Sequence, residues 1–183
     1  MALVLCQEGA MDLNQLDERL KADCEACAAL CCVALAFDKS PVFPFDKAAG
    51  EACRNLEACG TCRIHADLAT TGYMGCVQFH CHGAGPIVTR DLFSGSTWQT
   101  QPHLLRPMME AFWVFLRLQE QVLLLRHAAN LPLPESKQKE LHAFLEELSP
   151  EDGWTWDKFE ALDHARVSAR VKDWLASLRD VLA

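Results

Sequence analysis

The chain has 183 residues, half of them hydrophobic, and a formal net charge of −8. This length suits one domain, or one domain with an appendage, and it can bury a substantial core without covalent staples. A general nucleic-acid-binding surface needs clustered Lys and Arg. The sequence has no such cluster, so its composition argues against nucleic acid as a partner.

The first residues match neither a secretory signal nor a lipoprotein leader. Their apolar run stops at Cys6 without a preceding Lys or Arg, whereas a signal needs a positive start and a longer apolar stretch. We therefore expect a cytoplasmic protein, in a compartment where disulfides are scarce. Met11 is an alternative start that would make Cys6 incidental.

The first half of the chain predicts one helix followed by a long irregular segment. Leucines at helical spacing predict the helix over residues 12–23. From 33 to 81, prolines and glycines indicate loops, and only residues 75–80 suggest a short strand. So long a segment without periodicity is unusual inside a compact domain. Metal ligation would explain it, because ligands can organise loops that packing alone cannot.

The second half predicts three helices, over residues 103–130, between Pro134 and Pro150, and over 156–182. The first is apolar around most of its circumference, which favours a central position, with a possible bend near Pro107. Charged residues interrupt it well short of the roughly 20 apolar residues of a membrane span. Isolated histidines on these helices, such as His127 and His142, have no ligand partner at helical spacing.

The predicted fold class is therefore mainly α, with a cysteine-rich, loop-dominated, metal-binding N-terminal half packed on a C-terminal helical bundle. We predict a cysteine-rich region over residues 12–98 and a bundle over 103–183, packed as one compact unit. No membrane association is expected.

All ten cysteines lie in the first 81 residues, and four of them fall within the stretch CEACAALCC at 24–32. Disulfides, a metal or iron–sulfur site, and reactive redox thiols compete as explanations. Thiolates suit zinc and iron–sulfur clusters, and two CxxC pairs with an adjacent pair and three more cysteines are a strong signal. Buried free cysteines explain one or two such residues, but not eight clustered thiols. A disulfide scaffold fits poorly with the expected compartment.

The motifs CEACAALCC, CRNL, CRIH and GCVQFHC together resemble the YkgJ-type CxxCxxxCC family, described as zinc- or iron–sulfur-chelating. The likeness is closest to a variant at the front of actinobacterial pentapeptide-repeat proteins, and it continues through GSTWQ into the long helix. The resemblance covers about residues 20–130. It implies metal ligation by eight cysteines and leaves Cys6 and Cys59 outside the pattern: Cys24, Cys27, Cys31, Cys32, Cys53, Cys62, Cys76 and Cys81. His65 stands where relatives often have tyrosine.

Eight thiols suffice for two tetrahedral zinc sites, or for one [4Fe–4S] cluster with four thiols left over. The spacings do not match ferredoxin runs, and we favour zinc by a small margin. The resulting hypothesis is a cytosolic metal-binding protein with a structural or regulatory role. An iron–sulfur or zinc enzyme or redox component, and a thiol-based sensor of metals or oxidants, are the alternatives. A protein partner is not visible in the sequence.

The adjacent pair suggests a division of labour. If residues 24–32 are helical, Cys24, Cys27 and Cys31 fall within about a 60° arc, and Cys32 points about 100° away from Cys31. We therefore expect Cys31 to join Cys24 and Cys27 at one centre. Cys32 would join a separate set drawn from the later cysteines Cys53, Cys62, Cys76 and Cys81. The rival interpretation is that Cys32 is a buried core thiol.

Overall fold

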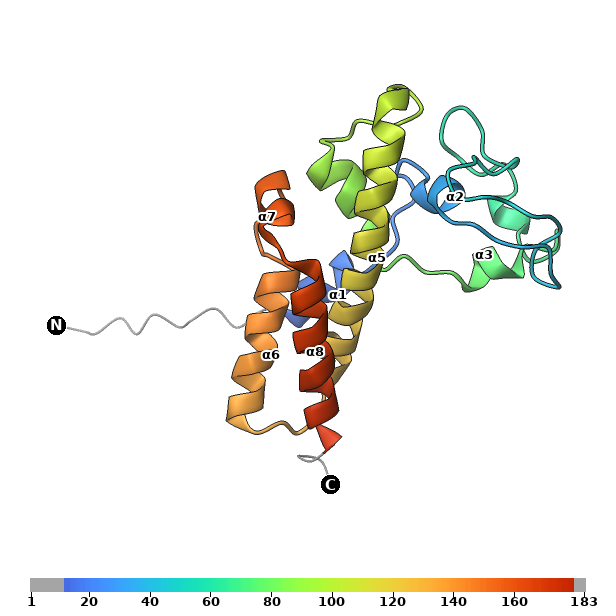
Figure 1. Ribbon diagram of the computed structural model, residues 1–183. Helices are drawn as coiled ribbons and strands as arrows, with labels where there is room; N and C mark the ends of the chain where they lie inside the picture. The colour runs from blue at the N-terminus through green and yellow to red at the C-terminus, as the bar shows by residue number, and fades with distance from the viewer. Residues whose placement is uncertain (1–11, 180–183) are drawn as a thin grey trace.

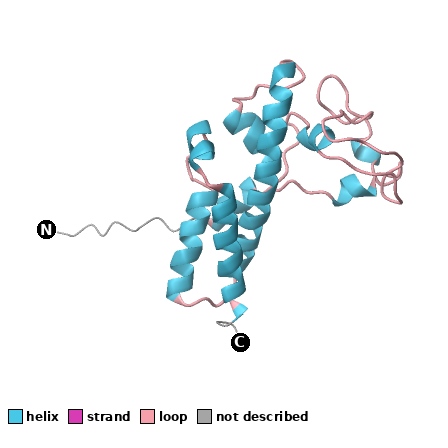
Figure 2. Cartoon of the chain, viewed as in Figure 1, coloured by secondary structure: helices cyan, strands magenta, loops and turns pink. Residues whose placement is uncertain are grey.

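The structure is a computed structural model that describes residues 12–179, so Cys6, Met11 and Leu182 lie outside the described residues. Within this range the chain is mainly helical, as predicted, with isolated β-bridges and no strand (Figure 2). None of the helices between residues 12 and 179 combines the length and apolar character needed to cross a membrane.

Helix α5, Leu105–Ala128, is the longest element and runs through the middle of the molecule (Figure 1). Its side chains Phe112, Phe115 and Val122 are completely buried. Helices α6, Glu135–Leu148, and α8, His164–Ser177, lie along the C-terminal half of α5, and the short helix α7, Trp156–Ala161, precedes α8. The apolar side chains of these helices recur at helical spacing, so each helix has an apolar face, and these faces pack together as the core.

The elements before α5 are short. Helix α1, Leu13–Arg19, is tied to α5 by an ion pair in which Arg126 donates to both carboxylate oxygens of Asp17 at 2.8 Å. Helix α2, Leu30–Ala34, packs against α5, as do α4, Ala84–Pro86, and the π-helical turn η2, Ile87–Leu92.

The chain between α2 and α4 forms a loop-rich lobe beside the N-terminal half of α5 (Figure 1). It contains only the 3-10 turn η1, His65–Asp67, and helix α3, Met74–Gln78, while a further 3-10 turn η3, Pro102–Leu104, leads into α5. Between residues 35 and 82, only Lys47, Asn55 and Tyr73 are buried. Apolar packing therefore contributes little to holding this segment together.

Three predicted elements differ from the structure. Residues 75–80 were expected to form a strand, but the structure has helix α3 there. A run of apolar residues this short does not distinguish a strand from a helix. The last helix is broken before α8, where the Asp163 side chain accepts from the Arg166 N–H and starts a new helix. Pro107 causes no break: it lies in the first turn of α5, where its missing N–H is not needed.

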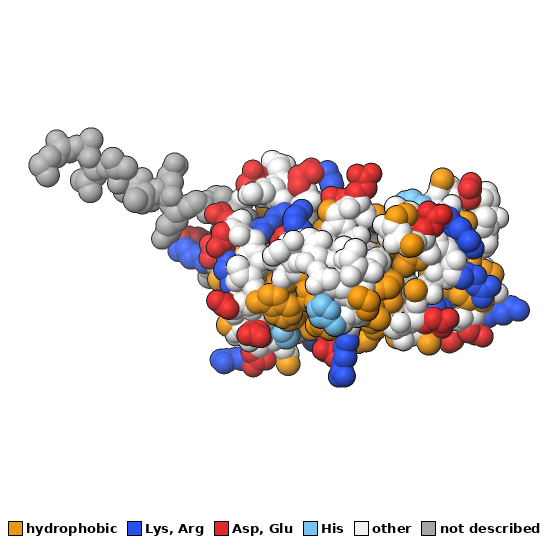
Figure 3. Space-filling model, turned by 90° about the horizontal axis from the view of Figure 1, so that it is seen from above, with side chains coloured by type: hydrophobic (Ala, Val, Ile, Leu, Met, Phe, Trp, Pro, Cys, Tyr) orange, Lys and Arg blue, Asp and Glu red, His pale blue; other side chains and the backbone are white. Residues whose placement is uncertain are grey.

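Acidic and basic side chains are interspersed on the face shown in Figure 3, and hydrophobic side chains form a band between them. A mixture of this kind gives no broad field of one sign on that face.

Candidate metal centre

The first four candidate ligands lie on a turn and a short helix. The Asp23 carboxylate accepts the N–H groups of Glu25 and Ala26 at 3.1 Å, which folds Cys24–Cys27 into a turn. Ala29 then adopts a left-handed conformation with φ of 54°, and α2 begins at Leu30. Because residues 24–27 are not helical, the predicted helical arc does not apply to them.

A hydrogen-bonded clamp fixes the peptide that follows Cys27. The Ala28 N–H donates to Thr89 Oγ1 at 2.9 Å, and the Ala28 carbonyl accepts Trp98 Nε1 at 2.7 Å and Gln99 Nε2 at 3.2 Å. Thr89 is buried in η2. Sequence reasoning did not assign these positioning residues, and the only signal for Trp98 and Gln99 was the GSTWQ motif within the resemblance.

Four thiols are neighbours beside this turn, and we call them the first thiol group: Cys24, Cys27, Cys31 and Cys81. Burial raises the pKa of Cys27 to about 11, and the nearby charge of Cys81 adds to the increase. Burial, followed by the charges of Cys81 and Cys32, also raises the pKa of Cys24. Cys81 was expected with the later cysteines, but the structure brings it to Cys24 and Cys27.

Four further thiols are neighbours around the loop-rich lobe and form the second thiol group: Cys32, Cys53, Cys62 and Cys76. Cys76 reaches the surface, yet desolvation of its sulfur raises its pKa to about 11, with smaller contributions from the other three thiols. The backbone brings the set together, because the Cys53 N–H donates to the Cys32 carbonyl at 3.0 Å and Leu56 forms a β-bridge with Cys62.

Backbone N–H groups point at two of these sulfur atoms. Those of Leu30 and Ala29 lower the pKa of Cys27 against the larger effect of burial, and that of Ile64 does the same for Cys62. A hydrogen bond to an ionised sulfur stabilises the thiolate. Each thiol group therefore has one cysteine, Cys27 or Cys62, whose thiolate form is stabilised by the backbone that follows it.

The two groups meet at the adjacent pair in α2. The Cys31 and Cys32 sulfur atoms are 4.0 Å apart, about twice the S–S bond length, and the nine described cysteines are all free. The interaction between them raises the pKa of Cys31 and lowers that of Cys32, and either sulfur atom can be the donor. Cys31 responds to the charges of Cys32, Cys27 and Cys24, and Cys32 influences Cys24 as well as Cys62 and Cys76.

The thiols are neighbours rather than a finished coordination shell. Among residues 12–179, no three His, Cys, Asp or Glu side chains lie close enough to hold a metal ion as they stand. Metal binding would thus require each group to contract, since zinc–sulfur bonds are only about 2.3 Å long.

The donor set and its surroundings fit a thiophilic ion. Four thiols per group match the requirement of a closed tetrahedral site. A Cβ atom on Gly85 would lie only 2.5 Å from Cys27 Sγ, so the glycine leaves space for that sulfur. Asn55, which is 5% exposed and lies between Cys53 and Cys62, has a buried side-chain Nδ2 without a hydrogen-bond partner. An unused buried N–H donor is suited to an anionic thiolate.

Residues outside the inferred ligand pattern have other surroundings. Cys59 is exposed, and its sulfur is 3.0 Å from Thr61 Oγ1. His65 is exposed in η1. His80 Nδ1 accepts the His82 backbone N–H at 3.0 Å, which leaves that nitrogen unavailable as a ligand.

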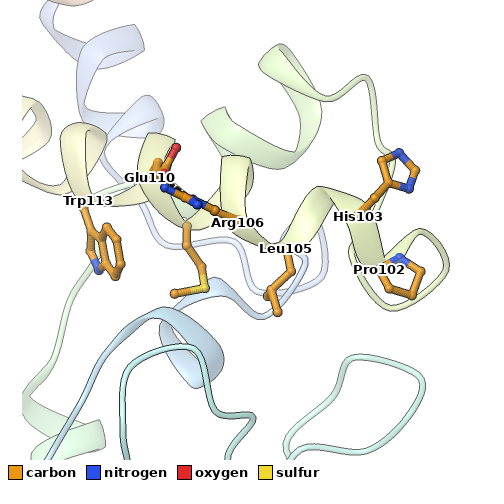
Figure 4. Close-up of a pocket in the computed structure, with 7 residues that line it drawn as sticks. Pro102, His103, Leu105, Arg106, Glu110 and Trp113 are labelled. Carbon is orange, nitrogen blue, oxygen red and sulfur yellow. Dashed lines mark hydrogen bonds and ion pairs between the residues drawn. The ribbon is translucent and has the colours of Figure 1, made fainter.

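An open cleft of about 490 Å³ lies along the start of α5 (Figure 4). Leu105, Met109 and Trp113 line its apolar side, and Arg106 donates to Glu110 at 2.8 Å beside it. No cysteine lines this cleft, so it is not part of the thiol groups.

Over 163 residues the chain is 32% identical to the uncharacterized protein YybG of Bacillus subtilis (strain 168). The similarity covers 89% of this chain, but the chain spans only 58% of that relative. No protein-family model matches the chain. No solved structure matches it either. Because YybG is itself uncharacterized, the similarity assigns no activity.

Proposed function

We propose that the chain is a metal-binding protein with one ion in each thiol group and a structural or regulatory role. The observation that supports this proposal is the proximity of the eight candidate cysteines, in which burial and the charge of Cys81 raise the pKa of Cys24 and Cys27, and burial and the charges of Cys32, Cys53 and Cys62 raise that of Cys76. Four thiolates complete the coordination of a structural zinc ion, whereas a catalytic zinc keeps one position open. The proposal therefore favours a structural role over catalysis.

Zinc is our first choice of metal, and an iron–sulfur cluster is the alternative. The separation of 4.0 Å between the Cys31 and Cys32 sulfur atoms would put the two centres close together. Single ions fit this spacing more easily than two cube-shaped clusters. A [4Fe–4S] cluster in one group would leave the other four thiols without a role.

We also propose that the chain is related to the YkgJ-type family, on the strength of the cysteine pattern and the GSTWQ motif. In this proposal, the loop-rich lobe is the metal-binding part, packed on a bundle formed by α5, α6 and α8, in a reducing cytoplasmic compartment. The near absence of buried apolar residues between positions 35 and 82 supports a metal-organised lobe.

Elemental analysis of protein freshly purified without oxygen tests this proposal. We expect two zinc ions per chain and a colourless protein, because zinc has no visible absorption. A brown protein that contains iron and acid-labile sulfide would favour the iron–sulfur cluster over zinc. Protein that contains neither metal, takes up neither when it is supplied, and reacts as free thiols would overturn the proposal.

Thiol-based sensing is a second candidate, favoured by the hydrogen-bonded pair Cys31 and Cys32. The pKa of Cys32 is lowered chiefly by its hydrogen bond with Cys31, and a lower pKa increases the fraction of reactive thiolate. The discriminating measurement is metal content during mild oxidation. A structural role predicts that the metal is retained, whereas reversible release in step with thiol oxidation would favour sensing.

A further inference from the structure

Lys47 is the only charged side chain among residues 12–179 that is buried, with 3% of its surface exposed. Its ammonium group donates to three backbone carbonyls, those of Val33 at 3.4 Å, Ala48 at 3.1 Å and Glu51 at 2.8 Å. No carboxylate in the described part of the chain forms an ion pair with it. A buried cation that no carboxylate contacts directly is costly.

The backbone around Lys47 holds its ammonium group beside the second thiol group. Val33 directly follows Cys32, and Glu51 is two residues before Cys53, whose N–H donates to the Cys32 carbonyl at 3.0 Å. Lys47 itself is fixed by two backbone hydrogen bonds with Phe37, of 2.8 and 3.0 Å. Its ammonium is thus anchored to the same backbone segments that carry Cys32 and Cys53.

We propose that Lys47 supplies the opposite charge for the metal centre of the second thiol group. This inference rests on the proposed function. Four thiolates around a divalent ion leave a net charge of minus two, and a fixed cation beside them stabilises that complex more than it stabilises four neutral thiols. The first thiol group has no buried Lys or Arg of its own, and Lys47 interacts with Cys31 less than with Cys53 and Cys32, so the second centre should depend on this charge more than the first.

Zinc titration of the metal-free full-length protein against a competing chelator tests the role of Lys47. Lys47→Met removes the charge at similar length, and Lys47→Arg is the matched control that retains it. We expect Lys47→Met to weaken one zinc equivalent by about 10- to 100-fold and to weaken the other much less. Lys47→Arg should bind more like the wild type. Two unchanged equivalents in Lys47→Met would overturn the inference.

Thermal unfolding separates this role from a merely structural one. Lys47→Met should lower the unfolding midpoint of the zinc-loaded protein but not that of the metal-free protein, where the cation lacks an opposite charge. An equal decrease in both forms would show that Lys47 is structural and would overturn the inference. Failure of wild-type protein to bind zinc in the same titration would instead refute the proposed function itself.

Discussion

The helices after residue 104 and the lobe between residues 35 and 82 are stabilised by different means. In the helices, large side chains such as Phe112, Phe115 and Leu145 are completely buried against one another. In the lobe, two of the three buried residues are polar, namely Lys47 and Asn55. The difference teaches that one part folds by burying apolar surface, while the other needs an additional source of stability, which the proposed metal ions would supply.

Metal removal should produce the largest difference between the lobe and the helices. A strong chelator should expose residues 24–82 to protease. The helices from α5 onward should remain comparatively protected, because large side chains such as Phe112, Phe115 and Leu145 hold them together, although Cys27, Cys31 and Cys81 pack against the same core. Mass spectrometry of the early fragments would locate the cuts. If the whole chain stayed equally resistant after verified metal removal, the two parts would not differ in this way.

A core substitution should test the comparison from the opposite side. Phe112→Ala removes a completely buried ring from α5 and should lower the free energy of unfolding by about 3–5 kcal/mol. Denaturant unfolding followed by circular dichroism would measure the loss. The variant that still folds should keep its metal content, whereas loss of metal in proportion to stability would mean that both parts depend on one core.

A matched pair of cysteine substitutions should sharpen the assignment within the lobe. Cys62→Ser removes a candidate ligand that receives a backbone N–H from Ile64, and it should reduce the metal content by one ion. Cys59→Ser changes an exposed thiol in the same CGTC stretch and should leave the metal content unchanged. Equal losses in both variants would make our assignment of this stretch wrong.

Metal affinity should depend on pH in a gradual way. The pKa of Cys27 and of Cys76 is raised to about 11 without metal, so both thiols are protonated at neutral pH and must release protons on binding. Zinc affinity should therefore rise as the pH increases through the neutral range and fall as it decreases. Titration in buffers of several pH values would measure this, and a flat profile would indicate thiols that are already ionised.

The sequence predicted α5 and α6 because helical periodicity is a local property, while the eight cysteines as metal ligands stay a prediction. It did not predict the helical segment over 84–92, where Gly85 and Pro86 indicate a loop, although both are buried. The sequence also could not predict which cysteines lie near Cys81, because this depends on how a loop returns to the turn at Cys24. The buried position of Lys47 likewise follows from tertiary contacts that spacing cannot reveal.

The central claim is that the eight cysteines form two separate centres, and the metal content of three variants tests it most directly. Cys27→Ser alters the first thiol group, Cys62→Ser alters the second, and the combined variant alters both. The account predicts two ions per chain in the wild type, one in each single variant and none in the combined variant. A single variant that loses all metal would show one shared centre and contradict the account.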